Sequence, residues 1–402
     1  MTPSAVRFGH SHRDRWLLDP DLTYLNHGTV GATPRVVLEA QQRLRDEIER
    51  EPARFLLRDL ADTRQRPMRA APRMRVAAAA VAAFVGARPD DLVFVDNATT
   101  GVNAILRSLI FAPGDEIVLT DHGYGAVGRT AAYIARRTGA VVRTAELPGP
   151  PYGPGPIADA IDAACSARTR VLLVDHITSG SALILPLAEI ARRARARGIS
   201  VLVDGAHAPG AIPLDLPALG VDWYVGNLHK WAMAPRSSAI LWAPPERQAD
   251  LHPTVISWGF DQGFAAEFDL TGTRDPTPWL AAPAGLAFLE SLGLDALRAW
   301  NHGLVRDAAR ALSVRWHVPL PCDETMIGSM VTLELPGRVR ADAAAVQALR
   351  DALLFEDRIE VQMHVFKGRA WVRLCGQAYV EASDVERFAD ALDRRVGSGL
   401  VS

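Results

Sequence analysis

The chain has 402 residues, long enough for two or three domains or for one large core with a smaller one beside it. Apolar residues make up 49% of it and charged residues 22%, as in ordinary soluble globular proteins, and the net charge of −2 gives no electrostatic support for a nucleic-acid or anionic-membrane partner. Its three cysteines, Cys165, Cys322 and Cys375, are odd in number and far apart, which argues against a disulfide framework and a zinc ribbon and predicts no metal site.

Residues 1–20 are expected to form an irregular lead-in that packs with a C-terminal domain. This segment has no apolar h-region, and no run in the chain reaches about 18 apolar residues, so we expect a cytoplasmic protein that does not enter a membrane. A short strand and turn at 24–28 precede a helix that starts near Thr33-Pro34. Arginines then recur from Arg58 to Arg75, which favours a solvated or subunit-facing helix face over an anion site.

From residue 76 onward, amphipathic helices alternate with short apolar runs. The pattern predicts helices at 76–85, 102–109, 126–138, 157–165 and 187–198, and strands at 92–95, 116–119, 140–142, 171–175, 201–204 and 223–225. Continuous apolar strands separated by amphipathic helices are typical of a mostly parallel sheet covered on both faces. We therefore expect an α/β fold with three layers, α/β/α, in a large domain spanning residues 21–283.

The regular alternation of predicted helices and strands ends after residue 283. A long helical stretch at 279–312 is followed by an alternating strand at 330–335, a helix at 342–354, short strands at 359–362 and 370–374, and a terminal helix at 383–396. This order predicts a smaller α+β domain spanning residues 284–402, against which the lead-in 1–20 would pack.

The stretch from Ser200 to Pro235 carries the first chemical signal. The buried run at 201–203 ends in Asp204, and the run at 223–225 leads through a turn to Lys230. In open parallel sheets ligands bind beyond the carboxyl ends of the strands, so these two residues are expected to face one site. Pyridoxal phosphate needs a lysine for its Schiff base and an acidic partner for its pyridine nitrogen. The alternative is an ordinary α/β chain with a surface lysine and a strand-end aspartate.

Four more polar segments follow predicted strands or lie in loops. Residues 97–101 open a helix, and hydroxyls with free N–H groups at such a position can hold a phosphate, although threonine is also a common structural cap. Residues 121–124 offer an aromatic face in Tyr124. Residues 175–179 follow another strand, and residues 271–275 supply hydroxyls and a guanidinium.

These segments together resemble the class V aminotransferase superfamily of fold type I pyridoxal-phosphate enzymes, and within it the isopenicillin-N-epimerase-like branch. The matching segments, which span residues 24–381 in the family's order, are YLNHGTVGATP, DNATTGVNA, LTDHGYGAV, VDHITSGSALILP, VDGAHAPG, GNLHKWAMAPR, GTRDPTPWLA and WVRLCGQAYVE. The resemblance implies pyridoxal 5'-phosphate as cofactor, an amino-acid-type substrate and a homodimer with shared active sites.

The resemblance also implies a role for each matched residue. Lys230 would form the Schiff base, Asp204 would bind the pyridine nitrogen, Tyr124 would stack on the ring and His207 would bind the phenolic oxygen. Thr273 would reach the phosphate of a neighbouring subunit, and Arg373 would bind the α-carboxylate of the substrate. The remaining cofactor-side residues are Thr99, Thr100 and His229 at the phosphate and Thr178 and Ser179 near the cofactor. Asn26 and His27 would border the substrate.

Each of these residues also has a plain structural interpretation when taken alone. A lone His207 on a core loop is usually a core histidine, Tyr124 alone would usually pack, and Arg373 on a strand would more often be a surface charge. The eight ordered segments favour the cofactor site over this combination of coincidences.

Enzymes of this kind share the cofactor residues and differ in the step after proton loss at Cα. Return of a proton on the opposite face gives an epimer, protonation of the cofactor gives transamination, and loss of a β-substituent makes the enzyme a lyase. Cysteine desulfurases need a nucleophilic cysteine shortly before the carboxylate-binding arginine, and residues 355–371 contain none. They do contain His364, which is either a second acid or base, a contact to an acidic substrate side chain, or a loop histidine in solvent.

We therefore expect an epimerase or racemase of an amino acid or small peptide. A lyase or aminotransferase from a biosynthetic pathway is nearly as well supported. A non-catalytic binding protein with this fold is the third interpretation, and the presence of Lys230, Asp204 and Arg373 together argues against it.

Overall fold

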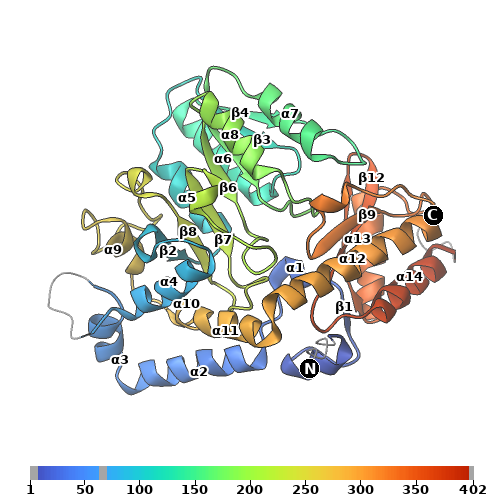
Figure 1. Cartoon of the computed structure of the whole chain (residues 1–402), viewed down its shortest axis with the longest axis horizontal. Helices are drawn as coiled ribbons and strands as arrows, with labels where there is room; N and C mark the ends of the chain where they lie inside the picture. Colours follow the sequence, from blue (N-terminus) through green and yellow to red (C-terminus); the bar gives the residue numbers. More distant parts are fainter. Residues whose placement is uncertain (1–7, 63–69, 398–402) are drawn as a thin grey trace, which may run out of the picture.

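The computed structural model describes residues 8–62 and 70–397, which form a large α/β unit and a smaller α+β unit (Figure 1). Residues 1–7 of the expected lead-in lie outside this range, as do Arg64, Arg66 and Arg69 of the arginine-rich stretch. The first described helices are α1 (His27–Val30), α2 (Arg35–Arg50) and α3 (Pro52–Arg54).

A seven-stranded sheet forms the centre of the large unit, in the order β2-β8-β7-β6-β5-β3-β4. Its strands are β2 (Leu92–Val95), β3 (Glu116–Thr120), β4 (Val141–Ala145), β5 (Thr169–Asp175), β6 (Ser200–Asp204), β7 (Trp223–Asn227) and β8 (Ala239–Trp242). Only β8 runs antiparallel to its neighbours β2 and β7. The expected mostly parallel sheet is confirmed, and β8 is a strand that the sequence pattern did not predict.

Helices cover both faces of this sheet, because alternate side chains of each strand point to opposite faces. On β5, Leu172 and Val174 join a core with α7 and α8, whereas Val171 and Leu173 join a second core with α5 and α6. The helices of this unit are α4 (Arg73–Phe84), α5 (Ala98–Ser108), α6 (Gly125–Thr138), α7 (Pro154–Ala164), α8 (Leu187–Ala196), α9 (Phe264–Asp269), α10 (Thr277–Leu280) and α11 (Ala282–Leu292). The result is the three-layer arrangement expected from the sequence.

The smaller unit is built on an antiparallel sheet in the order β11-β12-β9. Its elements are α12 (Leu294–Trp316), β9 (Met330–Glu334), α13 (Ala343–Phe355), β10 (Ile359–Glu360), β11 (Gln362–Phe366), β12 (Arg369–Cys375) and α14 (Ala382–Gly397). The short strand β1 (Thr23–Tyr24) pairs in parallel with β10. Phe8 and Trp16 of the N-terminal segment are buried in the core of this unit.

The expected single helical stretch at 279–312 is broken in the structure. Gly293 adopts a left-handed conformation with φ of 76° between α11 and α12, and this ends α11. Figure 1 shows α12 continuing into the small unit. Within the described residues no single helix is long and apolar enough to cross a membrane, and the one pair that is long enough together, Thr277–Leu292 with Leu294–Trp316, is bent by 76°.

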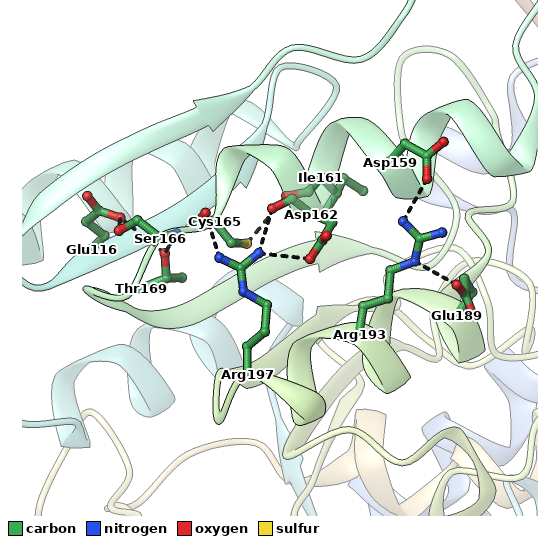
Figure 2. A network of polar contacts seen from close by, with 10 residues as sticks. All are labelled: Glu116, Asp159, Ile161, Asp162, Cys165, Ser166, Thr169, Glu189, Arg193 and Arg197. Atoms are coloured by element: carbon green, nitrogen blue, oxygen red, sulfur yellow. Dashed lines mark hydrogen bonds and ion pairs between the residues drawn. The ribbon is translucent and has the colours of Figure 1, made fainter.

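A polar network ties the first residue of β3 to the segments beside it (Figure 2). The buried carboxylate of Glu116 accepts hydrogen bonds from the hydroxyls of Ser166 (2.6 Å) and Thr169 (3.1 Å) and from Arg143 (3.1 Å). Burial alone would raise the pKa of Glu116, but these hydrogen bonds outweigh it and lower the pKa to about 2. Nearby, Arg197 joins α8 to the end of α7 through Asp162.

Substituting Glu116→Gln is expected to lower the free energy of unfolding at pH 7 by about 2 kcal/mol, since it removes charged hydrogen bonds from a buried site. Because the pKa is lower in the folded state, the carboxylate stabilises the fold above its ordinary pKa of 4.5 and loses this effect as the pH falls toward about 2. Urea unfolding between pH 7 and pH 3 measures both effects. Glu189→Gln, which removes the partly exposed Glu189–Arg193 ion pair drawn in the same figure, is the control and should change stability much less. An equal loss in both variants would contradict this assignment.

Candidate active site

Polar residues gather at the carboxyl edge of the large sheet, where β5 and β6 end side by side. Asp175 and Asp204 are the last residues of these strands and face each other in register. Lys230 follows the neighbouring strand β7 by three residues. The topology therefore places the predicted carboxylate and lysine at one edge of the sheet.

Lys230 is almost fully buried, with 9% of its surface exposed. Its Nζ lies 3.2 Å from Nε2 of His207, and no carboxylate among the described residues lies within ion-pair distance of it. Burial, followed by the positive charge of Arg373, lowers the pKa of Lys230 to about 8, although Asp204 acts in the opposite direction. The amine is therefore substantially neutral in mildly alkaline solution, as a nucleophile or base must be.

Asp204 and Asp175 are both buried, and burial raises the pKa of each. The carboxylate of Asp204 accepts a hydrogen bond from the backbone N–H of Ala206 (3.0 Å), and its charge further raises the pKa of Asp175. In the described part of the chain neither carboxyl group has a cationic side chain within ion-pair distance. A cationic ring nitrogen bound here would supply the missing charge.

His207 is also buried, and burial together with the charge of Lys230 holds its pKa well below the usual range. Its Nδ1 has no hydrogen-bond partner among the described residues. A buried polar atom without a partner is unfavourable unless a ligand satisfies it. Such an atom beside Lys230 fits the expected bond to a cofactor oxygen.

The N-terminus of α5 supplies polar groups at the same edge. Asn97 caps the helix by accepting from the backbone N–H of Thr100 (2.9 Å), and Asn227 accepts from that of Ala98 (2.8 Å). Thr99 and Thr100 are half-buried, and the hydroxyl of Thr100 also contacts Asn97. The first turn of this helix therefore keeps hydroxyls and the positive end of its dipole for an anion.

Two further residues expected at the phosphate differ in their placement. His229 is half-buried beside Lys230, and its Nδ1 lies 3.2 Å from the carbonyl of Ser238. Thr273 is exposed, next to Arg274, which forms an ion pair with Asp96 just before the α5 cap (3.1 Å). One chain alone does not test whether Thr273 reaches a neighbouring subunit.

Arg373 is a charged residue that is almost fully buried. It lies on β12 with 2% of its surface exposed, and it is not the surface charge that a strand arginine usually is. Its guanidinium donates to the carbonyl of Ser179 (2.7 Å) and to the side chains of Asn26 (3.1 Å) and Thr29 (2.6 Å). Of the carboxylates that the structure describes, none lies within ion-pair distance of it. A buried, preoriented guanidinium of this kind fits the expected role of binding a carboxylate.

The two substrate-side residues of the N-terminal segment have different places. Asn26 orients Arg373, and its own amide donates to Glu360 (2.6 Å). His27 was expected to border the substrate. It is fully buried, with Nδ1 2.8 Å from the hydroxyl of Tyr379 and Nε2 3.0 Å from the carbonyl of Lys230, so it supports the lysine from behind.

A cavity of about 250 Å³ adjoins these residues on the side of the small unit. Tyr124, the residue before α6, lies at its wall and is 48% exposed. Ser179 also lines it, whereas Thr178 is buried behind, 2.7 Å from the hydroxyl of Ser181. His364 is on β11 and lines the cavity, and its buried Nδ1 has no hydrogen-bond partner among the described residues, so the interpretation as a loop histidine in solvent is wrong.

Sequence reasoning assigned no role to several residues of this cavity. They are His122, Tyr152, Phe366 and Trp371. His122 could have been found, because it stands two residues before Tyr124 in the same loop. Phe366 and Trp371 lie on the hairpin of β11 and β12, far in the chain from Tyr152, and only the tertiary structure brings these three residues to the loop of His122.

In the described ranges, no group of three or more His, Cys, Asp or Glu side chains is placed to hold a metal ion. The residues present fit pyridoxal phosphate instead, with an amine, a buried carboxylate, an unpartnered imidazole nitrogen and a helix N-terminus at one sheet edge. The sequence contains only two lysines, and the other, Lys367, lies in an ion pair with Asp121 (2.5 Å).

Comparison with known proteins gives the same assignment. The model of the aminotransferase class-V family matches residues 24–385. The chain is 35% identical to isopenicillin N epimerase of Streptomyces clavuligerus, across 98% of this chain and all of that protein. It is 30% identical to a probable chloroplastic L-cysteine desulfhydrase of Arabidopsis thaliana, across all of this chain and 87% of that protein.

Solved structures share the fold. A lysine-to-alanine variant of C-DES, with glycine covalently linked to its pyridoxal-phosphate cofactor, aligns with a TM-score of 0.78 at 22% identity and covers 95% of this chain and 99% of its own. The apo structure of a cysteine desulfurase from Thermococcus onnurineus aligns with a TM-score of 0.78 at 20% identity and covers 98% and 100%. The chain therefore belongs to the class V aminotransferase family and is a fold type I, pyridoxal-phosphate-dependent enzyme.

Proposed function

We propose that this enzyme acts at Cα of an amino acid or an amino-acid-derived substrate and that it is an epimerase or racemase. The observation that carries the proposal is the presence of two buried basic side chains, neither of which has a carboxylate within ion-pair distance among the described residues. They are Lys230 with its lowered pKa and Arg373 with its preoriented guanidinium. An α-carboxylate on Arg373 would hold the substrate's Cα near the amine of Lys230.

Each functional group of the chain would have a separate task. Bound pyridoxal phosphate supplies an electron sink for the electrons left when a bond at Cα breaks. Asp204 would keep a proton on the ring nitrogen, and the first turn of α5 would hold the phosphate. Lys230 would take the α-proton once the substrate amine has replaced it, because burial lowers the pKa of its amine and so raises the neutral fraction. Arg373 would orient the carboxylate and so the Cα–H bond.

The relatives support the epimerase and one alternative. The isopenicillin N epimerases of Streptomyces clavuligerus and Amycolatopsis lactamdurans, at 35% and 32% identity, favour return of the proton to Cα. The cysteine desulfhydrase relatives favour a lyase that releases a β-substituent. Residues 355–371 contain no cysteine, which disfavours persulfide chemistry of the desulfurase kind.

Incubation with single L-amino acids in deuterated water distinguishes these reactions. The proposal predicts deuterium at Cα and gradual formation of the D-enantiomer, without keto acid. Release of a keto acid with ammonia or sulfide would instead establish the lyase, and keto acid with an aminated cofactor would establish an aminotransferase. No exchange with any amino acid would contradict action at Cα of a free amino acid.

The pKa of Lys230 makes a prediction for capture of the cofactor by the apoenzyme. Only the neutral amine attacks an aldehyde, so the capture rate should rise with pH to a plateau, with a midpoint near 8. Arg373→Gln removes a positive charge that lowers this pKa, so the midpoint should move to higher pH. Stopped-flow absorbance of apoenzyme mixed with pyridoxal phosphate measures both midpoints, and an unmoved midpoint in the variant would contradict the assigned coupling.

We also propose a cytoplasmic homodimer in which Thr273 contributes to the neighbouring subunit's site. Thr273 is exposed, and the segment 255–260 exposes the apolar side chains of Val255, Ile256, Trp258 and Phe260, as a subunit interface would require. Sedimentation velocity of the holoenzyme should give a dimer, and a monomer that retains full activity would overturn this proposal.

A further inference from the structure

The cavity beside Arg373 is placed to receive the side chain of the substrate. Ser179 and Gly180 lie on its wall, and Ser179 also accepts the hydrogen bond from Arg373 (2.7 Å). Gly123, another wall residue, stands next to Asp175, since a Cβ built on it would lie 3.7 Å from that carboxylate. Two residues of the cavity wall therefore lie next to Arg373 and to Asp175, the last residue of β5.

Aromatic rings form much of the wall. His122 contacts Tyr152 edge to face, with 5.2 Å between ring centroids, and Phe366 at 4.8 Å. Trp371 donates its indole N–H to the carbonyl of Phe366 (3.0 Å), so its polar atom is already used. These rings offer flat apolar surface to a ligand rather than charge.

Two imidazoles add hydrogen-bonding capacity without charge. Burial lowers the pKa of His122 and of His364 to about 4 each, so both rings are neutral at pH 7. Nε2 of His122 and Nδ1 of His364 are buried and have no hydrogen-bond partner in the described part of the chain. Each ring can therefore still offer one nitrogen to a ligand.

The hydrogen bonds that link Thr178, Ser181 and His122 indicate which ring nitrogen of His122 carries the proton. The hydroxyl of fully buried Thr178 accepts from the N–H of Leu183 (2.8 Å) and has Ser181 as its partner for donation (2.7 Å). Ser181 then donates to Nδ1 of His122 (2.7 Å), which leaves the proton of that ring on Nε2. If Ser181 donated to Thr178 instead, the hydroxyl hydrogen of Thr178 would have no partner among the described residues. His122 is therefore a donor toward a ligand.

The charged groups at the cavity already have partners of opposite charge. Asp121, on the wall, pairs with Lys367 (2.5 Å), and Lys367 also lies 3.6 Å from Glu146. A carboxylate or ammonium side chain would find no free opposite charge here. A cysteine side chain, with one methylene and a thiol, would leave most of about 250 Å³ unfilled.

We infer that the substrate is an α-amino acid whose side chain carries a neutral, planar hydrogen-bonding group, an amide or an aromatic heterocycle, held between the aromatic wall and the imidazoles of His122 and His364. The inference rests on the proposed function, because it assumes that the α-carboxylate binds Arg373. It adds to that proposal the residues that select the substrate.

Binding to the holoenzyme tests the inference through the change that each amino acid causes in the cofactor's visible absorbance. L-glutamine represents the amide and L-histidine the heterocycle, and L-alanine, L-cysteine, L-glutamate and L-lysine are the comparisons. At least one of the first two should bind more tightly than all four comparisons, and which one does identifies the group. In His122→Phe and in His364→Phe the ratio of that affinity to the affinity for L-alanine should fall by about tenfold.

His12→Phe, a substitution outside the cavity wall on the N-terminal segment, is the matched control and should leave the ratio unchanged. Equal affinities for all six amino acids, or ratios that the two cavity variants leave unchanged, would overturn the inference while leaving the proposed function standing. An absorbance that responds to no amino acid would overturn the proposed function, and this inference with it.

Discussion

Replacement of Lys230 by alanine is expected to abolish turnover, with a loss of at least about 10³-fold, because the variant lacks both the amine that holds the cofactor and the base at Cα. The absorbance band of covalently held pyridoxal phosphate should disappear at the same time. The fold should survive, because the lysine makes no ion pair among the described residues. Absorbance, activity and thermal unfolding of the purified variant measure the three effects.

Lys367→Ala is the matched control, since it removes the other lysine of the chain. Lys367 is partly exposed and pairs with Asp121 and Glu146, so its loss should leave the covalent absorbance band in place. If the band persists in Lys230→Ala and disappears in Lys367→Ala, the assignment of Lys230 is wrong.

Replacement of Arg373 by glutamine is expected to raise KM about 100-fold for substrates with a free α-carboxylate, because truncating one partner of a buried charge pair is costly. The effect should be specific for the carboxylate. The native enzyme should strongly prefer an amino acid over its amide, and the variant should have lost most of that preference. Steady-state kinetics with the two ligands measures it.

Arg373→Lys separates the contribution of the charge from that of the planar fork. Lysine keeps the positive charge but cannot donate at once to Ser179, Asn26 and a carboxylate in the geometry that the guanidinium provides. We expect an intermediate KM and a partly restored preference. A KM for the free amino acid that is unchanged in both variants would show that the carboxylate binds elsewhere.

The large unit could be predicted from the sequence because its signal is local. Apolar runs such as 92–95 and 171–175 became β2 and β5 with nearly the same bounds, since a strand buried on both faces must be apolar throughout. Strand β8 was not predicted because four apolar residues after a loop show no periodicity that distinguishes a strand from a helix. Ala239–Trp242 is a strand because it pairs with β2 and β7. β2 is distant in the sequence, and the loop that carries Lys230 separates β7 from β8.

The site residues also fall into those that the sequence could place and those that it could not. Asp204 and Lys230 could be placed together because parallel strands bring their carboxyl ends to one edge. His27 could not be placed, since its two hydrogen bonds reach Tyr379 and the Lys230 carbonyl, 352 and 203 residues away. His364 was uncertain for a similar reason. Its stretch resembled a loop, but pairing with β12 made it strand β11 and turned the residue toward the cavity.

The central claim is that pyridoxal phosphate is bound covalently at Lys230, and borohydride reduction of the holoenzyme followed by peptide mass mapping tests it most directly. The chain has only two lysines, so a label on a lysine must lie on Lys230 or on Lys367. We predict a pyridoxyl group on the peptide that contains Lys230 and none on the peptide that contains Lys367. A label on Lys367, or no label after reduction of cofactor-saturated enzyme, would contradict the account.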